Sequence, residues 1–301
     1  MTARNGVCDI GRRGTVLLTL ALVGGCARGI LDPHGPVGRS EKLILYDATA
    51  LMLTVVAPVI LCTLAFAWWF RSGNPHALRR PNWEYSGRIE FVTWSIPALM
   101  VLFLSGIAWI GAHDLDPPKP LGGATTPVEI QVVSLDWKWL FIYPQEEVAA
   151  VNEMVIPVNV PVHFKLTSAS VMNSFFVPQL GSQIYTMAGM ITELNLMASE
   201  SGTYNGLSAQ FSGAGFSDMR FALRAVSPEE YRAWLARTRA ASTPLDEAHY
   251  NQLTRPGVAN QPSFYGTVAP GFFDSLVESH GAPPVQAAEV EAADIDGYRA
   301  W

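Results

Sequence analysis

Two long, uncharged apolar runs most constrain how this chain can fold. They cover residues 48–70 (ATALMLTVVAPVILCTLAFAWWF) and 91–111 (FVTWSIPALMVLFLSGIAWIG), and neither contains Asp, Glu, Lys or Arg. A helix of about 20 apolar residues crosses the hydrocarbon core of a bilayer. A buried helix of a soluble protein is usually shorter and keeps a polar stripe. The sequence therefore predicts transmembrane helix 1 over 48–70 and transmembrane helix 2 over 91–111, joined as a hairpin.

The distribution of basic residues predicts the orientation of this hairpin. The loop 71–90 contains four arginines, whereas Lys119 is the sole Lys or Arg in residues 112–130. Loops rich in Lys and Arg stay on the cytoplasmic side of a bacterial membrane. We therefore expect a cytoplasmic loop at 71–90, a periplasmic N-terminal segment at 26–47, and a periplasmic location for everything after the second span.

The start of the chain has the pattern of a targeting segment. Three arginines, Arg4, Arg12 and Arg13, precede TVLLTLALV, an apolar run too short to span a bilayer, and small residues, Gly24 and Gly25, stand directly before Cys26. This pattern is typical of a lipoprotein signal peptide, here residues 1–25, after which the cysteine becomes the lipid-bearing first residue. It predicts a protein of the bacterial inner membrane whose N-terminus is anchored by lipid on the periplasmic side.

After a linker at 116–127, apolar residues recur with a period of two. Short runs rich in β-branched and aromatic residues alternate with Pro, Gly and Asn signals, which predicts a β-sandwich or Greek-key barrel within residues 112–226. Residues 227–280 are expected to form a helical arm that begins with Ser227 as N-cap, and the Pro/Ala/acidic tail 281–301 is expected to be disordered. The predicted strands are 128–134, 137–143, 162–168, 191–197 and 219–225.

Composition restricts the classes of partner. The chain is 49% hydrophobic and only 15% charged, with a formal net charge of −6 and no dense run of Lys or Arg. These values fit a membrane protein with a sizeable polar part and exclude a nucleic-acid-binding surface.

The stretch GLSAQFSGAGFSDM, residues 206–219, has the spacing of a metal-binding loop. Ser208 and Ser212 are four residues apart, Phe216 follows by four and Met219 by three, and the intervening glycines would let the backbone wrap closely around a ligand. The loop nevertheless contains almost none of the residues that bind metals. Met219 alone is a packing residue more readily than a metal site.

The order of lipoprotein signal, two-helix hairpin and outward sandwich resembles subunit II of the haem-copper respiratory oxidases. The resemblance implies a mixed fold class, in which the transmembrane hairpin precedes a periplasmic all-β, cupredoxin-like sandwich with C-terminal helices. In members that accept electrons from cytochrome c, this sandwich holds the binuclear copper centre CuA, through an isolated histidine and a C-x-E-x-C-G-x-x-H-x-x-M run. Laid on this sequence, these ligand positions fall on Asn173, Ser208, Gln210, Ser212, Phe216 and Met219. Serine is a hard, weak donor, and copper that cycles between two oxidation states needs thiolates and imidazoles, so no CuA site is expected and no metal is assigned to this chain.

The stretches ILDPHGPVG, VVSLDWKWLFIYP, NSFFVPQLGSQIYTMAGM and SGAGFSDM are similar to those of the quinol-oxidising branch, the cytochrome bo type ubiquinol oxidases. This resemblance covers residues 26 to about 280. It implies an enzyme complex that oxidises ubiquinol, reduces dioxygen to water and pumps protons. Its two haems and CuB reside in subunit I, which ubiquinol reaches from the bilayer, so cytochrome c is not a partner. This chain would then bind no cofactor and would have no catalytic residue. It would pack on subunit I, alongside subunits III and IV, and cap the periplasmic face.

The resemblance also implies roles for individual residues. Glu90, just before the second span and seven residues before its proline, matches a family glutamate at the mouth of a proton-uptake channel; the alternative is an interfacial acid that balances Arg88. Trp137 and Trp139 match an aromatic cluster on the electron-transfer route of the cytochrome c branch. Without copper we interpret them as residues that pack the sandwich against the membrane subunit.

Two other hypotheses for the whole chain remain open at this point. One is a lipid-anchored periplasmic scaffold or receptor that uses a metal-free cupredoxin domain as a binding surface. The other is a copper-bearing cytochrome c oxidase subunit with unusual ligands. The first predicts a chain that is stable without haem proteins, and the second predicts copper in the domain.

Overall fold

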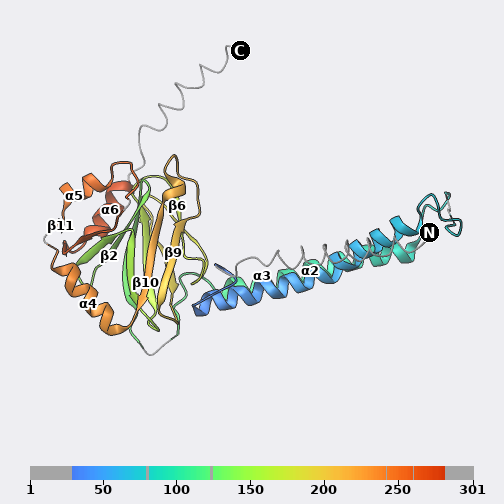
Figure 1. Ribbon diagram of the computed structural model, residues 1–301, viewed down its shortest axis with the longest axis horizontal. Helices are drawn as coiled ribbons and strands as arrows, with labels where there is room; N and C mark the ends of the chain where they lie inside the picture. The colour runs from blue at the N-terminus through green and yellow to red at the C-terminus, as the bar shows by residue number, and fades with distance from the viewer. Residues whose placement is uncertain (1–28, 79–80, 123–124, 242, 260, 282–301) are drawn as a thin grey trace, which may run out of the picture.

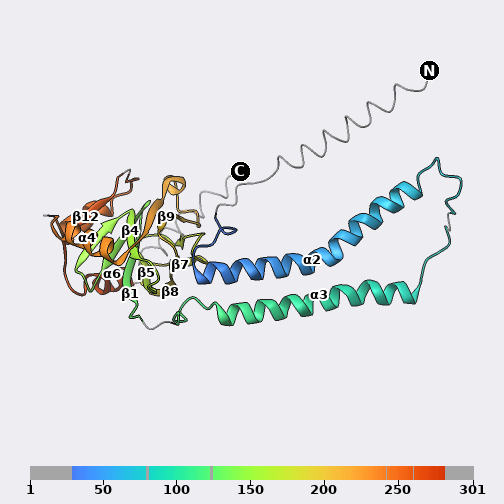
Figure 2. The ribbon, with the colours of Figure 1, turned by 60° about the horizontal axis from the view of Figure 1, so that its bottom comes forward.

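The protein consists of a long helical hairpin attached to a β-sandwich (Figures 1 and 2). The computed structural model describes residues 29–78, 81–122, 125–241, 243–259 and 261–281. The predicted signal peptide 1–25, the lipidation site Cys26 and the predicted tail beyond Gly281 lie outside the described residues.

The hairpin is formed by α2 (Pro36–Trp69) and α3 (Gly87–Asp114), which lie side by side and present apolar side chains all around. Both helices are long and apolar enough to cross a membrane. Each is longer than its apolar run, and α2 begins inside the segment 26–47 because Pro36 starts the helix at a position where its missing N–H is not needed. The turn between the helices lies at the end far from the sandwich (Figures 1 and 2).

Two sheets form the sandwich. The first has the strand order β12-β3-β2-β1-β5-β8 and the second β4-β10-β9-β6-β7. The pairs β1–β5 and β4–β10 are parallel and the other named pairs of these two sheets are antiparallel. The strands are β1 (Val128–Leu135), β2 (Lys138–Tyr143), β3 (Val148–Val151), β4 (Glu153–Pro157), β5 (Val162–Ser168), β6 (Asn173–Phe176), β7 (Ile184–Thr186), β8 (Thr192–Leu196), β9 (Gly202–Ser208), β10 (Arg220–Val226) and β12 (Ser263–Tyr265).

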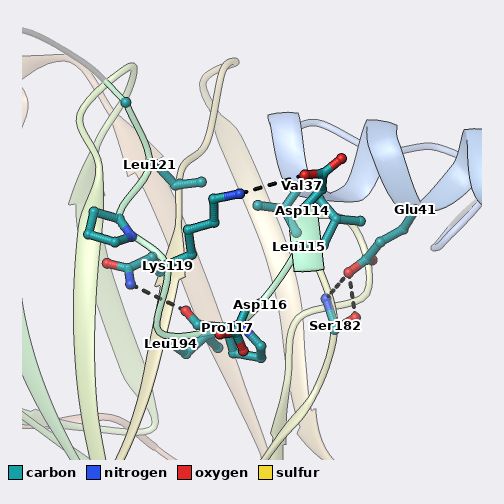
Figure 3. A pocket seen from close by; sticks show the side chains of 13 residues that line it. Val37, Glu41, Asp114, Leu115, Asp116, Pro117, Lys119, Leu121, Ser182 and Leu194 are labelled. Atoms are coloured by element: carbon teal, nitrogen blue, oxygen red, sulfur yellow. Dashed lines mark hydrogen bonds and ion pairs between the residues drawn. The ribbon is translucent and has the colours of Figure 1, made fainter. Parts of the chain in front are cut away.

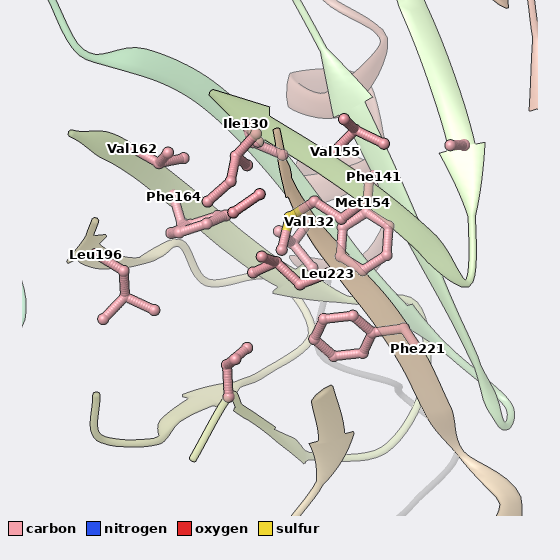
Figure 4. Close-up of a cluster of buried hydrophobic side chains, with 14 of the residues drawn as sticks. Ile130, Val132, Phe141, Met154, Val155, Val162, Phe164, Leu196, Phe221 and Leu223 are labelled. Atoms are coloured by element: carbon pink, nitrogen blue, oxygen red, sulfur yellow. The ribbon is translucent and has the colours of Figure 1, made fainter. Parts of the chain in front are cut away.

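The main core lies between the two sheets (Figure 4). At its centre, the ring of Phe221 lies 5.1 Å from that of Phe141, 5.2 Å from Phe175 and 5.7 Å from Trp139, all measured between centroids. Trp139 is fully buried here. The expectation that Trp139 packs against a membrane subunit is therefore wrong, because the side-chain alternation of β2 turns this ring inward.

The C-terminal arm packs in two places: its first helix packs against the main core, and its later part covers the outer face of the six-stranded sheet, on the side away from β9 and β6 (Figure 1). It begins with α4 (Pro228–Arg239), whose capping box is complete: Ser227 Oγ accepts from Glu230 N, and the Glu230 carboxylate accepts from Ser227 N. The arm continues through β11 (Pro244–Leu245), α5 (Glu247–Leu253), β12, β13 (Thr267–Val268) and α6 (Phe272–Gly281). Contrary to the expectation, the segment 227–280 is therefore not helical throughout, because β12 pairs with β3 at the edge of the six-stranded sheet.

The arm and the sheet share a second apolar core. On the sheet side it contains alternate residues of β1, β2 and β3, and on the arm side Tyr250, Tyr265 and Phe273. Lys138 at the start of β2 connects the sheet to the arm, because its Nζ donates to the carbonyls of Leu253 at 2.8 Å and Arg255 at 2.7 Å. Partial burial lowers the pKa of the Lys138 ammonium.

The start of α2 is docked on the sandwich through backbone contacts. His34 N donates to Gln179 O at 2.7 Å, and Gly38 N donates to Leu180 O at 3.0 Å. A Cβ at Gly35 would lie 2.4 Å from the carbonyl oxygen of Met197, so only glycine permits this approach. The close contact fixes where the hairpin leaves the sandwich.

Candidate functional site

Two loops at one end of the sandwich bring together four of the six positions that the sequence resemblance aligned with copper ligands. Asn173 is the first residue of β6, and Ser208 and Met219 flank the loop between β9 and β10. Ser208 Oγ donates to Asn173 Oδ1 at 3.2 Å, and Ser208 N donates to Met219 O at 3.1 Å. Ser212 Oγ lies 3.9 Å from Met219 Sδ. The tertiary structure therefore gathers residues that lie far apart in the sequence.

Three of these residues are almost fully buried, with exposed fractions of 1% for Asn173, 3% for Ser208 and 1% for Met219. Their polar atoms are paired within the loops. The Asn173 amide donates to Val171 O at 3.2 Å, and the Ser208 hydroxyl also lies 3.2 Å from the Gln210 carbonyl. Burial and pairing together make this end of the sandwich a small, satisfied polar cluster.

The other two positions lie toward the surface. Phe216 begins the short 3₁₀ helix η1 (Phe216–Asp218), and its half-buried ring contacts Phe211 with centroids 5.6 Å apart. Gln210 contributes its backbone carbonyl to the cluster, and its side chain is half-exposed. In the described part of the chain, no three or more His, Cys, Asp or Glu side chains lie close enough together to hold a metal ion.

Trp137 supports the β9–β10 loop from one side. Its backbone is left-handed, with φ of 67°, and its indole Nε1 donates to Ser212 O at 3.1 Å. A Cβ at Gly215 would lie 2.4 Å from this ring, and Gly213 needs its positive φ of 109°. Trp137 thus packs on the loop of its own chain, and its side chain is half-buried there. The glycines and the aromatic residue were visible in the sequence, but their contact was not.

Glu90 lies in the first turn of α3, at the end of the hairpin far from the sandwich. Its backbone N–H donates to Ser86 O at 3.0 Å, and its carbonyl accepts from Thr93 Oγ1 at 3.0 Å. A carboxylate at this position interacts favourably with the positive end of the helix dipole. The structure therefore places Glu90 and the polar cluster at opposite ends of the molecule.

Comparison with known proteins identifies two family segments in this chain. Residues 130–226 match the family described as cytochrome c oxidase subunit II, periplasmic domain. Residues 239–279 match the COX aromatic rich motif, and these are the residues that form most of the arm and its aromatic core.

Curated relatives match most of the chain. The cytochrome bo(3) ubiquinol oxidase subunit 2 of Pseudomonas aeruginosa is 48% identical over 86% of this chain and 80% of its own length. The ubiquinol oxidase subunit 2 of Acetobacter aceti is 47% identical over 88% of this chain and 86% of its own length. A solved structure, the periplasmic domain of cytochrome oxidase subunit II from Bradyrhizobium japonicum, aligns with 38% of this chain and 94% of its own at 24% identity and a TM-score of 0.37. From its sequence relatives, this chain belongs to the subunit II family of ubiquinol oxidases, within the haem-copper oxidases.

Proposed function

We propose that this chain is a non-redox subunit of a proton-pumping ubiquinol oxidase, and that the polar cluster is a former CuA site that has lost its ligands. The observation that carries the proposal is the hydrogen bond between Ser208 and Asn173. It joins the two positions at which the copper-binding branch has a bridging cysteine and a histidine. A neutral hydroxyl and a neutral amide that satisfy one another replace a thiolate and an imidazole.

The donor set does not fit a binuclear copper centre. Serine hydroxyls stay protonated near neutral pH and are hard donors, whereas copper in two oxidation states needs polarisable ligands. Phe216 offers no donor atom at all, and Met219 is the one soft side chain among the six positions. We therefore propose that no electron transfer passes through this domain.

Copper titration of the purified chain tests this part of the proposal. After exposure to Cu(II) and passage over a chelating resin, the chain is expected to retain far less than stoichiometric copper, because weak hard donors exchange their metal readily. Atomic absorption and the visible spectrum are the measurements. Chelator-resistant, stoichiometric copper with thiolate-like absorption would contradict the proposal and would favour a cytochrome c oxidase subunit with unusual ligands.

The redox centres are proposed to lie in subunit I, a separate chain with two haems and CuB. Ubiquinol is soluble in the bilayer and reaches subunit I directly, so a copper relay that faces the periplasm is unnecessary. The hairpin supports this arrangement, because the most apolar stretch of each helix has no residue buried within this chain. We propose that α2 and α3 pack on subunit I, that the sandwich caps its periplasmic face, and that subunits III and IV complete the complex.

Purification in mild detergent through a tag on this chain tests the assembly. We expect large multi-span partners and a haem spectrum to co-purify, since the apolar faces of the hairpin need protein or lipid cover. A chain that elutes alone, folded and free of haem would instead favour a periplasmic scaffold or receptor.

Cys26 is proposed to carry the lipid anchor after removal of residues 1–25. Its support is the sequence pattern before it, with two small residues directly preceding the cysteine. Mass spectrometry of the N-terminal peptide of the mature chain would show the added acyl mass. An unmodified peptide that begins elsewhere would contradict the anchor.

Glu90 is proposed to admit protons from the cytoplasmic side. Glu90→Gln keeps the size and the helix-forming character of the side chain but removes the titratable group. Steady-state quinol oxidase turnover is therefore expected to fall severalfold, while haem content and subunit stoichiometry stay normal. Glu84→Gln, a change in the same loop, serves as the matched control and should leave turnover unchanged.

Unchanged turnover of a fully assembled Glu90→Gln complex would contradict the uptake role. Glu90 would then be an interfacial acid that balances Arg88, two residues earlier on the same helix. Glu90→Asp separates the two roles further, because it retains a titratable carboxylate and should restore part of the turnover.

A further inference from the structure

A cavity of about 220 Å³ lies where the hairpin meets the sandwich (Figure 3). The first turns of α2 contribute Val37 and Glu41 to its wall, the end of α3 and the following linker contribute Asp114, Asp116 and Lys119, and the sandwich contributes Leu194. The cavity wall therefore contains apolar side chains together with acidic and basic ones. The polar cluster of the former copper site contributes no residue to it.

The length of the hairpin places this cavity at the depth of the lipid headgroups. At 1.5 Å per residue, the 28 residues of α3 extend about 42 Å, close to the roughly 40–45 Å of a bilayer that includes its headgroup layers. Asp114, the last residue of α3, thus lies near the outer edge of the membrane. Tyr46 and Trp109 stand one to three turns closer to the membrane centre, exposed, as aromatic residues of the interfacial belt do.

Glu41 and Lys119 in the cavity wall both have partners within the chain. Glu41 is held by Ser182, whose backbone N–H donates to Glu41 Oε1 at 2.9 Å and whose hydroxyl donates to the same oxygen. Lys119 Nζ donates to His113 O at 3.3 Å and lies 3.7 Å from Asp114 Oδ1, and its side chain is 53% exposed. Since an ammonium carries three donors, Lys119 retains the capacity to bind an anion. Three carboxylates against one ammonium leave the cavity with an excess of negative charge.

We propose that this cavity binds the phosphoethanolamine headgroup of a membrane phospholipid. The ammonium of the headgroup lies among the carboxylates of Glu41, Asp114 and Asp116, and its phosphate lies at Lys119. The acyl chains run down beside the hairpin, where the apolar side chains of α2 and α3 are exposed. The inference requires only that the hairpin crosses the membrane, and it is independent of copper loss and of proton uptake.

The chemistry selects phosphatidylethanolamine among common bacterial lipids. A primary ammonium donates three hydrogen bonds to carboxylates, and charge-assisted bonds of this kind are the stronger ones. An anionic headgroup such as phosphatidylglycerol has no cation to place among three carboxylates. A choline headgroup carries the charge but lacks every N–H donor. The bound lipid would hold the linker 115–122 against α2 and stiffen the joint between hairpin and sandwich.

Hydrogen–deuterium exchange of the intact oxidase complex tests the proposal. The complex is placed in nanodiscs of phosphatidylcholine doped with either phosphatidylethanolamine or phosphatidylglycerol of the same acyl chains. The peptide that covers residues 115–122 should exchange more slowly with phosphatidylethanolamine than with phosphatidylglycerol. Each charge removed, by Glu41→Gln, Asp116→Asn or Lys119→Met, should raise the doping level needed for half-maximal protection roughly two- to fivefold.

Lys165→Met is the matched control. Lys165 pairs with Glu129 at 3.1 Å on the surface of the sandwich and is not part of the cavity wall, so its loss should leave the protection unchanged. Equal protection by both lipids, or protection that persists in the three cavity variants, would overturn the proposal. Protection by soluble glycerophosphoethanolamine in detergent, without any by the doped nanodiscs, would overturn the membrane source of the headgroup.

Discussion

Introducing copper-ligand side chains at five positions of the two loops is expected to give this chain a coloured binuclear copper centre. Four of the ligand positions already meet, because Ser208 contacts both Asn173 and Met219, and Ser212 lies beside the Met219 sulfur. Trp137 supports this loop by packing on its glycines and by its hydrogen bond to the Ser212 carbonyl. Such preorganisation favours one copper geometry over heterogeneous binding or a disulfide. The substitutions are Asn173→His, Ser208→Cys, Gln210→Glu, Ser212→Cys and Phe216→His.

The measurements are copper stoichiometry and the mixed-valence visible and electron paramagnetic resonance spectra. The same variant with serine retained at position 212 is the control, since a single thiolate cannot bridge two ions through two sulfurs and should give no binuclear spectrum. A folded five-site variant that takes up no copper, or one scattered ion, would contradict the idea that the loops keep the geometry of a copper site.

Phe273→Ala is expected to destabilise the periplasmic domain by about 3–5 kcal/mol, the range for truncation of a fully buried phenylalanine. Phe273 is 1% exposed and lies in the second core between the arm and the outer face of the six-stranded sheet. Its loss would leave a cavity above β1, β2 and β3. Urea unfolding of the purified chain in detergent, followed by tryptophan fluorescence, gives the free energy of unfolding.

Phe211→Ala is the control for that experiment. Phe211 is also a phenylalanine, but its exposed fraction is 72%, so its truncation should change the stability by no more than about 0.5 kcal/mol. If Phe273→Ala lowered the free energy of unfolding no more than Phe211→Ala does, the arm would contribute little to the stability of the domain. The aromatic residues of the arm would then serve another purpose than packing.

The local pattern predicted the elements whose periodicity is strong. All five predicted strands are present, as β1, β2, β5, β8 and β10, and the Ser227 cap and the following helix are confirmed. The other strands of the two sheets were not predicted. β6 and β7 are short, with four and three residues, and β9 contains two glycines, so none has a long alternating pattern.

The second core had a signal in the sequence that was not used. The stretch WLFIY in β2 is apolar at every position, and every residue of β2 is buried in the structure. A half-buried strand alternates, whereas a continuous apolar run indicates that both faces are covered. The run therefore indicated a cover on the outer face, but it could not say that residues 239–279 provide it.

The candidate site was predicted by resemblance and not by local physics. Asn173 and Ser208 are 35 residues apart, and their contact depends on β6 pairing with β9, for which neither strand carries a distinctive pattern. The family assignment made from the quoted stretches is confirmed by the curated relatives. The assignment of Trp139 to a membrane contact was wrong, because the direction of its side chain follows from the strand that carries it. The same assignment for half-buried Trp137 stays a prediction.

By itself, the sequence determined the hairpin, the sandwich and the helix that follows Ser227, because apolar length, alternation and capping act over a few neighbouring residues. The tertiary structure alone decided three features: the polar cluster of Asn173 and Ser208, the support of its loop by Trp137, and the charged cavity between Glu41 and Lys119. Each depends on contacts between segments far apart in the chain. Such contacts form only when whole faces are buried together, and the entropy cost of that closure is offset by the complete fold and not by any local segment.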